Sequence, residues 1–349
     1  MKVMTLFGTR PEIIRLSQVI KLLDRYCDQT LVHTGQNYDP NLSDIFFSEL
    51  DLRQPDIHLG IQASVFAEQA GQILARAGEA LARIQPDRLL ILGDTNSGLA
   101  AIVAARMGIP VYHMEAGNRC YDDRVPEEIN RRIIDHCSDV LMPYTHRSKE
   151  NLLREGIERQ RIFVTGNPIY EVLQAYAPAV EASVALERQE VAAGHYFLVT
   201  LHRAENVDDP ERLERLLHGL SLVADTYDEP MVVSLHPRTA DKLARAGLTP
   251  ESRRVRLLQP LGFFDFVNLE RHARCVLSDS GTVQEECAIF NVPNITLRDV
   301  TERAETIEAG SNILAGAEPQ QVLGAVQLVL GVAPGWRAPA EYVEPHVAA

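Results

Sequence analysis

The sequence predicts an α/β protein with two Rossmann-like domains, each built on a doubly wound parallel sheet. The length of 349 residues suits two domains, each with its own core. Short apolar runs alternate with longer amphipathic stretches, and this alternation restarts midway along the chain. We expect an N-terminal domain over 1–168, a C-terminal domain over 169–335 and a tail over 336–349. Two such sheets facing each other form a cleft, and ligands bind at the carboxyl ends of their strands.

The apolar runs are predicted to be buried strands, because they are short and nearly continuous, as in parallel sheets covered on both faces. In the first half they lie at 2–7, 30–34, 88–92, 110–114 and 139–143. In the second half they lie at 197–201, 231–235, 255–259, 274–278 and 293–297. Amphipathic helical patterns separate them, for example around 65–84 and 97–107.

The composition argues against several classes of function. The net charge of −14 disfavours nucleic acid as a partner, and no apolar run approaches the roughly 20 residues of a membrane helix. Residues 1–12 are expected to form a first strand and turn, and not a signal peptide. The five cysteines include no C-x-x-C pair, which argues against disulfides or a zinc site and favours a reducing cytoplasm.

Polar side chains follow the predicted strands of the first half. Arg10 stands at the start of a helix, where it could bind a phosphate or carboxylate; an incidental arginine in a capping turn is the alternative. Asp94 follows the strand at 88–92, and capping of the next helix is the commoner use of such an aspartate. Glu115 directly follows a buried strand and precedes small residues, which favours a functional carboxylate.

A helix is predicted to begin at Pro126. Its first turn contains Glu127, where the helix dipole favours a negative charge. The spacing allows two i,i+4 pairs, Glu127 with Arg131 and Glu128 with Arg132. We expect Glu128 and Arg132 to form a solvated salt bridge, whereas a functional and a surface role remain open for Glu127 and Arg131.

The second half offers two histidines and a turn of small residues. His202 follows the strand at 197–201, a position that favours anion binding or proton transfer. The alternative is a histidine with a purely structural role, its ring hydrogen-bonded within the fold. The same two interpretations apply to His236, where the functional one has weaker support. Ser280 and Gly281 lie between a strand and a helix, where backbone N–H groups can approach a phosphate. Further residues of this edge are Glu286, which could accept from ribose hydroxyls, and the cations Arg298 and Arg303. The turn therefore predicts a nucleotide diphosphate site, without a dinucleotide fingerprint or P-loop.

Together these segments resemble the non-hydrolysing UDP-N-acetylglucosamine 2-epimerase family. The matching segments occur in order over nearly the whole chain: FGTRPE (7–12), GDTNS (93–97), HMEAGNR (113–119), VPEEINR (125–131), FVTGNP (163–168), LHRAEN (201–206), LHPR (235–238), SDSGTVQEE (278–286) and RDVTER (298–303). The resemblance implies a GT-B-like fold, similar to that of two-domain UDP-sugar glycosyltransferases, with the active site in the interdomain cleft. It also implies a cytoplasmic homodimer that serves polysaccharide biosynthesis.

The resemblance implies roles for the matching positions. The catalytic acidic residues are matched by Asp94, Glu115 and Glu127, and the residues that bind or catalyse at the sugar diphosphate by Arg131 and His202. The contacts to nucleotide and phosphate are matched by Arg10, Ser280, Gly281, Glu286 and Arg303, and a further motif position by His236.

Two departures from the family pattern bear on ligand binding. Arg15 stands where the family commonly has lysine, at a substrate-binding position, and a planar guanidinium does not simply replace an ammonium. In segment 33–39, Gln36 matches the pattern that helps several members bind a second, activating UDP-sugar, but Asp39 replaces a usual glutamine. Allosteric activation therefore stays open. The segments look closest to members that act on modified sugars.

The implied substrate is a UDP-linked 2-acetamido sugar, UDP-N-acetylglucosamine giving UDP-N-acetylmannosamine or a close variant. One variant is UDP-2-acetamido-2,6-dideoxy-L-talose giving UDP-N-acetyl-L-fucosamine. The C2 proton is not next to a carbonyl, so the chemistry expected is anti-elimination of UDP to a 2-acetamidoglycal and re-addition. No redox cofactor or metal is expected. The alternatives are a hydrolysing 2-epimerase, a UDP-sugar glycosyltransferase and a non-catalytic nucleotide-sugar sensor.

Overall fold

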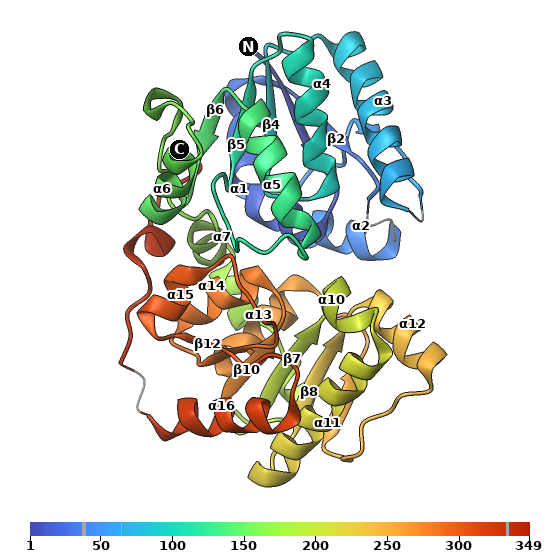
Figure 1. Cartoon of the computed structure of the whole chain (residues 1–349), viewed down its shortest axis with the longest axis vertical. Coiled ribbons are helices and arrows are strands. Elements are labelled where there is room, and N and C mark those ends of the chain that lie inside the picture. Colours follow the sequence, from blue (N-terminus) through green and yellow to red (C-terminus); the bar gives the residue numbers. More distant parts are fainter. Residues whose placement is uncertain (37–39, 64, 333–334) are drawn as a thin grey trace. The chain divides into compact units, whose positions relative to one another are not determined.

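The computed structural model describes residues 1–36, 40–63, 65–332 and 335–349 (Figure 1). The chain divides into two compact units. Unit 1 comprises Met1–Ala175 with Ala340–Ala349, and unit 2 comprises Tyr176–Pro339. Each unit has a six-stranded sheet, and all strand pairs in both sheets are parallel. The two-domain α/β fold is confirmed.

The sheet of unit 1 has the strand order β3-β2-β1-β4-β5-β6. Its strands are β1 (Lys2–Phe7), β2 (Asp28–His33), β3 (Ile57–His58), β4 (Arg88–Leu92), β5 (Val111–Met114) and β6 (Val140–Met142). Five of them were predicted; β3 was missed because two residues are too short to show a pattern. The order reverses between β1 and β4, so the ligand-binding crevice of such a sheet lies beyond the carboxyl ends of these two strands.

Helices cover both faces of this sheet, which explains why its central strands are apolar on both sides. The helices are α1 (Arg10–Tyr26), α2 (Pro40–Glu49), α3 (Phe66–Ile84), α4 (Ala100–Arg106), α5 (Pro126–Cys137), α6 (His146–Arg154) and α7 (Ile169–Ala175), with 3-10 turns η1 (Asn96–Leu99) and η2 (Arg159–Arg161). Met4 and Leu6 of β1 pack with Ile73 of α3 and Ile91 of β4 in one buried cluster. Burial of each such side chain stabilises the fold by about 1.5–3 kcal/mol.

The sheet of unit 2 has the order β12-β11-β10-β7-β8-β9, which is the same arrangement read from the other end. Its strands are β7 (Phe197–Leu201), β8 (Met231–Leu235), β9 (Val255–Leu258), β10 (Cys275–Ser278), β11 (Asn294–Thr296) and β12 (Asn312–Leu314). Only β12 was not predicted, since it is short and begins with a polar residue. The order reverses between β7 and β10, so the crevice of unit 2 lies beyond these two strands.

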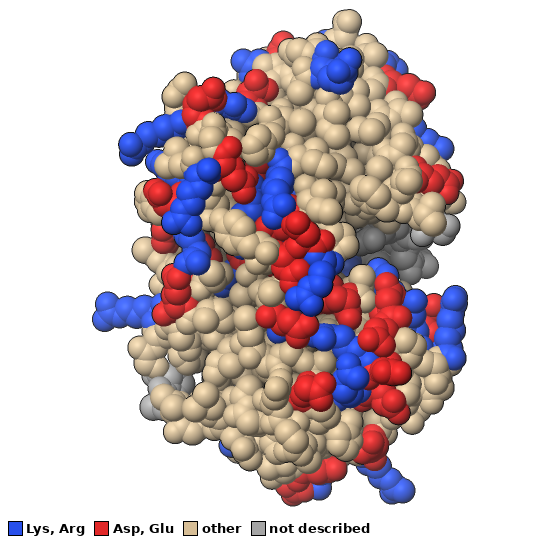
Figure 2. Space-filling view, in the orientation of Figure 1, with Lys and Arg blue, Asp and Glu red and all other residues tan. Residues whose placement is uncertain are grey.

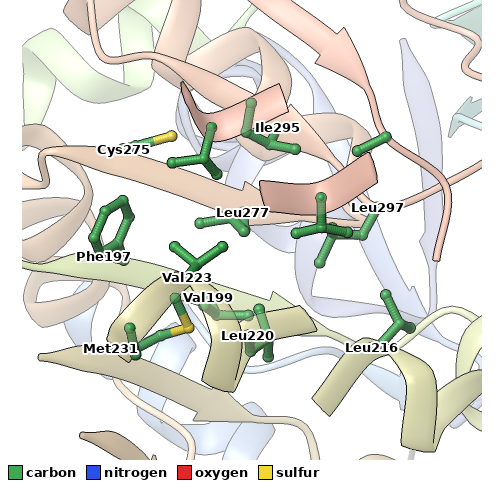
Figure 3. Packing of buried hydrophobic residues seen from close by; sticks show 14 of the residues in the cluster. Phe197, Val199, Leu216, Leu220, Val223, Met231, Cys275, Leu277, Ile295 and Leu297 are labelled. Atoms are coloured by element: carbon green, nitrogen blue, oxygen red, sulfur yellow. The ribbon is translucent and has the colours of Figure 1, made fainter. Parts of the chain in front are cut away.

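The helices of unit 2 are α8 (Ala177–Glu181), α9 (Ala185–Arg188), α10 (Ala204–Val207), α11 (Pro210–Tyr227), α12 (Pro237–Ala246), α13 (Phe263–His272), α14 (Gly281–Phe290), α15 (Ala304–Ala309) and α16 (Pro319–Gly331). Figure 3 shows Phe197 and Val199 of β7 and Leu277 of β10 packing with Leu220 and Val223 of α11. Cys275 belongs to the same core, and all five cysteines are free. In the described ranges, no helix has the length and apolar composition needed to cross a bilayer.

The boundary between the units differs from the sequence expectation in two places. Unit 1 ends at Ala175 and not near residue 168, because α7 packs against α1. Residues 340–349, expected as a separate tail, belong to unit 1. The Asn167 amide donates to the Glu341 carbonyl (2.8 Å), the Ala348 amide donates to the Glu171 carboxylate (2.8 Å), and Tyr342 is buried. The position of segment 340–349 cannot be predicted from sequence periodicity, because the segment contains only the 3-10 turn η3 (Ala340–Val343).

Candidate functional site

Glu115 occupies an unusual backbone position at the carboxyl end of β5. Its φ is +65°, in the left-handed region, which costs a residue with a Cβ roughly 1–2 kcal/mol. The side chain is buried and forms an ion pair with Arg15 of α1. The Tyr144 hydroxyl donates to Oε2 (3.2 Å) and the Asn118 amide to Oε1 (3.3 Å). The surroundings therefore hold this carboxylate in one place.

Arg15, predicted to contact substrate, lies against Glu115. Its guanidinium is buried and stands 5.7 Å from the centre of the Tyr144 ring. A planar guanidinium can pair with the carboxylate and face the ring at once, which an ammonium does less well. The pair favours the charged form of Glu115.

Asp94 and Arg131 form a second ion pair at the same edge of the sheet. Arg131 of α5 donates from Nε to Asp94 Oδ2 (2.8 Å), and its Nη2 lies 2.7 Å from the same oxygen in an ion pair. The capping alternative for Asp94 is not observed, since Thr95 is the N-cap of η1. A Cβ placed on Gly93 would lie 3.8 Å from Glu115 Oε2, so the Glu115 carboxylate lies beside the residue that precedes Asp94. The structure thus brings two of the predicted carboxylates together.

Glu128 is fully buried, so the prediction of a solvated side chain was wrong. It accepts from the backbone amides of Cys120 (3.0 Å) and Tyr121 (3.0 Å), and from Arg131 Nη1 (2.7 Å). Burial alone would raise the pKa of Glu128, but the amides and Arg131 outweigh it and the pKa is lowered. Helical spacing alone could not show that the preceding loop folds back onto this carboxylate. Its partner Arg132 is 39% exposed and pairs also with Asp123 (2.9 Å), as a surface residue would.

Two further residues lie at the start of helices in unit 1. Glu127 is half-buried in the first turn of α5. Arg10 is half-buried at the start of α1, with its guanidinium 5.6 Å from the centre of the Phe46 ring. Burial lowers the pKa of Arg10, as expected for a cation partly removed from water.

Glu12 is a buried carboxyl that the sequence analysis missed. Its Oε2 accepts from the Gly8 amide (3.1 Å) and the Thr9 hydroxyl (2.7 Å), and its Oε1 from the Thr95 hydroxyl (3.2 Å). It therefore links the turn after β1 to the turn after β4, across the point where the strand order reverses. Burial is the main cause that raises the pKa of Glu12 to about 7. The only signal in the sequence was its place within the segment 7–12.

In unit 2, Asp279 is fully buried after β10 and organises the turn that contains His202. It accepts from the amides of His202 (3.0 Å) and Arg203 (2.9 Å), from the Asn206 side chain (3.1 Å), and from His202 Nδ1 (3.0 Å). Burial alone would raise the pKa of Asp279, but His202 and these amides hold it well below its usual range. Since Nδ1 faces Asp279, the other ring nitrogen of His202 is left for a ligand; the side chain is 33% exposed.

The ring of His236 lies 6.0 Å from that of His202, measured between centroids. His236 Nδ1 accepts from the Arg238 amide (3.2 Å) and caps α12. This contact is the structural role that the alternative for His236 describes.

The turn at the start of α14 has the features of an anion site. Ser280 is the N-cap, and Gly281 begins the helix. A Cβ on Gly281 would lie 2.8 Å from a Glu302 oxygen and 3.5 Å from Arg303 Cζ, so a larger residue here would displace the Glu302 carboxylate. Arg303 is buried and pairs with Glu285. Glu286, also buried, follows one turn into the helix. A helix amino terminus beside a guanidinium suits a phosphate group.

The predicted residues thus form two groups, one at the strand ends of each unit. The group in unit 1 consists of Arg10, Arg15, Asp94, Glu115, Glu127 and Arg131, and that in unit 2 of His202, His236, Ser280, Gly281, Glu286 and Arg303. Gln36 accepts from the Ser97 amide (2.9 Å), whereas Asp39 lies outside the described residues. The visible face carries acidic and basic side chains interspersed (Figure 2). Across the described part of the chain, no three His, Cys, Asp or Glu side chains are grouped to hold a metal ion.

Comparison with known proteins agrees with this geometry. A family model described as UDP-N-acetylglucosamine 2-epimerase matches residues 22–348. A UDP-N-acetylglucosamine 2-epimerase of Methanocaldococcus jannaschii is 42% identical over 97% of this chain and 95% of its own length. A UDP-2,3-diacetamido-2,3-dideoxy-D-glucuronate 2-epimerase of Pseudomonas aeruginosa is 36% identical over 95% of this chain and 93% of its own.

Solved structures agree as well. The M. jannaschii UDP-GlcNAc 2-epimerase in complex with UDP-GlcNAc and UDP has a TM-score of 0.95 at 40% identity, covering 100% of this chain and 97% of that one. The Neisseria meningitidis UDP-GlcNAc 2-epimerase bound to UDP-GlcNAc has a TM-score of 0.88 at 29% identity, covering 100% and 97%. These similarities confirm the predicted family resemblance and the GT-B-like fold.

Proposed function

Because this chain belongs to the UDP-N-acetylglucosamine 2-epimerase family, we propose that it converts UDP-N-acetylglucosamine to UDP-N-acetylmannosamine. The family makes it an isomerase, a UDP-sugar 2-epimerase. The observation that carries the proposal is the division of groups between the units. Carboxylates with arginine partners lie at the strand ends of unit 1, and an anion-binding helix start lies in unit 2.

The reaction we propose is elimination followed by re-addition. A base removes the C2 proton, the C–H electron pair forms the C1=C2 bond, and the C1–O bond breaks to release UDP. In the return step a proton reaches C2 from the opposite face and a UDP oxygen attacks C1, so all atoms balance. The step needs a base, an acid and stabilisation of the departing diphosphate.

Proton transfer is assigned to Asp94, Glu115 and Glu127. Two of them, Asp94 and Glu115, are proton acceptors in the resting enzyme, because each has an arginine partner that favours the charged carboxylate. Arg131 and Arg15 act as these partners. The diphosphate and nucleotide are assigned to Arg10, His202, His236, Ser280, Gly281, Glu286 and Arg303.

A modified UDP-sugar is the second candidate substrate. The P. aeruginosa relative, 36% identical, is named for a 2,3-diacetamido glucuronate, so the family includes 2-epimerases for such sugars. UDP-2-acetamido-2,6-dideoxy-L-talose, which gives UDP-N-acetyl-L-fucosamine, is the variant we consider first. A panel of UDP-sugars assayed for kcat/KM distinguishes these substrates.

We further place the protein in the cytoplasm as a homodimer that supplies polysaccharide biosynthesis. The five free cysteines support a reducing compartment. The likeness to UDP-sugar epimerases supports the biosynthetic role. Light scattering of the purified protein tests the dimer.

The decisive experiment is an incubation with the UDP-sugar alone in D₂O, with products resolved by NMR. We expect a UDP-linked epimer that contains deuterium at C2. A substrate with oxygen-18 bridging C1 and the β-phosphorus should move the label into non-bridging positions. Free sugar and UDP would indicate a hydrolysing enzyme, and no change without an acceptor would indicate a transferase. Epimerisation with the original C2 hydrogen and the bridging label retained would contradict elimination.

A further inference from the structure

A buried ion cluster lies directly behind the turns that contain Asp94 and Glu115. It consists of His113 on β5, Asp135 on α5, and Arg119 in the loop between them. His113 Nδ1 lies 2.9 Å from Asp135 Oδ1, and Arg119 Nη2 lies 2.7 Å from Asp135 Oδ2. Arg119 pairs also with Glu155 (2.6 Å). The four formal charges, two positive and two negative, cancel if His113 is an imidazolium.

The hydrogen-bond partners of His113 determine its protonation. Its Nε2 lies 2.9 Å from the carbonyl oxygen of Gly93, which can only accept, so Nε2 carries a proton. Its Nδ1 faces Asp135, which also receives the Gly117 amide (3.1 Å) and Arg119. Burial alone would raise the pKa of Asp135, but His113 and Arg119 outweigh it, and the pKa is lowered. Both ring nitrogens of His113 are thus engaged, Nε2 with the Gly93 carbonyl, to which it donates, and Nδ1 with Asp135.

The cluster contacts the backbone on both sides of the candidate carboxylates. Through Nε2 it binds the carbonyl of Gly93, the residue before Asp94. Through Asp135 it binds the amide of Gly117, two residues after Glu115. Gly93, Glu115 and Gly117 all have positive φ, and Glu115 carries a side chain there at an energetic cost. Such a conformation persists only when the surroundings hold it.

We propose that His113 and Asp135 are positioning residues, a buried histidine–aspartate pair that sets the relative placement of Asp94 and Glu115. The pair touches no substrate and acts through the peptide groups that flank the two carboxylates. Outer partners of this kind typically change activity by about 10–100-fold when they are replaced. This inference rests on the proposed assignment of proton transfer to Asp94 and Glu115.

The first test is NMR of the unmodified protein labelled with ¹⁵N-histidine, with the His113 ring assigned through bonds to its backbone amide. We expect Nε2 of His113 to carry a proton, which it donates to the Gly93 carbonyl, and Nδ1 to be hydrogen-bonded to Asp135. An Nε2 without a proton would overturn the proposal. This measurement needs no variant to fold and does not depend on the enzyme's substrate.

The second test uses His113→Gln and Asp135→Asn, with Arg53→Gln as the control. Arg53 pairs with Asp24 (3.0 Å) and Asp56 (2.7 Å) and binds the Gln29 carbonyl near the start of β2, away from the carboxyl ends of the strands. We expect kcat to fall about 10–100-fold in the first two variants, with UDP affinity unchanged, and to stay near wild type in the control. A kcat within threefold of the control would overturn the proposal.

A double-mutant cycle separates positioning from general destabilisation. If the pair acts through Asp94, then Asp94→Asn lowers kcat by a smaller factor in the Asp135→Asn background than in the wild type. Fully additive losses would contradict the proposal. If the wild-type protein epimerises no UDP-sugar, the proposed function is wrong. The NMR result for His113 does not depend on that outcome.

Discussion

The two units have the same strand order, and each places a buried carboxyl where that order reverses, yet the two carboxyls behave in opposite ways. In unit 1, Glu12 accepts from one amide and two hydroxyls and has no cation among these partners; its pKa is raised to about 7. In unit 2, Asp279 accepts from two amides, an asparagine and an imidazole; its pKa is lowered. Both carboxyls are buried, so the difference between their hydrogen-bond donors decides the direction in which each pKa shifts.

This difference matches the division of labour that we propose. Unit 1 places a buried carboxyl of raised pKa, Glu12, and the arginine-paired Asp94 and Glu115 around the turns after β1, β4 and β5. In unit 2, Asp279 orders the turn of His202, and Arg303, paired with Glu285, lies beside the helix start that we assign to an anion. The same sheet thus supports acid–base chemistry in one unit and ligand binding in the other.

The largest effect is expected from the carboxylates of unit 1. Asp94→Asn, Glu115→Gln and Glu127→Gln should each lower kcat by about 10²–10⁴-fold, the usual contribution of a positioned acid or base. The affinity for UDP should stay within about threefold, because the nucleotide is assigned to a different set of residues. Steady-state kinetics and calorimetry with UDP measure the two quantities. Near wild-type kcat in all three variants would remove unit 1 from the chemistry.

A smaller effect is expected from the anion site. Arg303→Lys and Arg10→Ala should weaken UDP binding by about 10–100-fold, since a hydrogen bond to a charged group contributes about 1.5–3 kcal/mol. Lysine is chosen at 303 because it keeps a positive charge beside the buried Glu285. The matched control is Arg132→Ala, at an arginine 39% exposed and paired with Asp123. Equal losses in all three variants would erase the distinction between site and surface.

The sequence predicted the strand ends well because parallel sheets concentrate function there. Asp94, Glu115 and Arg131 lie together as expected, since strand and helix boundaries alone place them. Glu128 was misjudged because its burial depends on a loop whose fold no local pattern reveals. Glu12 and Asp135 were missed for a related reason. Thr95, which ties Glu12 to the turn after β4, and His113, which faces Asp135, lie far along the chain from them, so only the assembled sheet shows these contacts.

The pKa of Glu12 is raised and that of Asp279 is lowered, so the two carboxyls should affect the pH dependence of stability in opposite directions. A carboxyl whose pKa rises on folding, here from 4.5 to about 7, binds its proton more tightly in the folded state. The contribution of Glu12 to the free energy of unfolding therefore falls as the pH rises through this window. Asp279 has a lowered pKa, so its contribution is present at neutral pH and is lost on acidification below about 4.

Glu12→Gln changes the free energy of unfolding relative to the wild type. We expect this change to be more positive at pH 7.5 than at pH 5, by on the order of 1–2 kcal/mol. Asp279→Asn should instead be most destabilising at neutral pH and less so near pH 3.5. Urea denaturation across pH measures both. If the two variants shift the pH dependence in the same direction, the carboxyls do not differ as described.

The smallest effect, none at all, is expected for removal of metals and NAD. The charge that develops on a departing diphosphate can be met by the start of α14 and Arg303, so the proposed step needs no divalent cation for neutralisation. Elimination and re-addition transfer a proton and not a hydride, so no redox cofactor enters the balance. Activity after exhaustive dialysis against EDTA and charcoal treatment should equal that of the untreated enzyme. Loss of activity that one metal ion restores would show that the start of α14 and Arg303 do not suffice. Loss that NAD restores would show that unit 1 does not act by proton transfer alone.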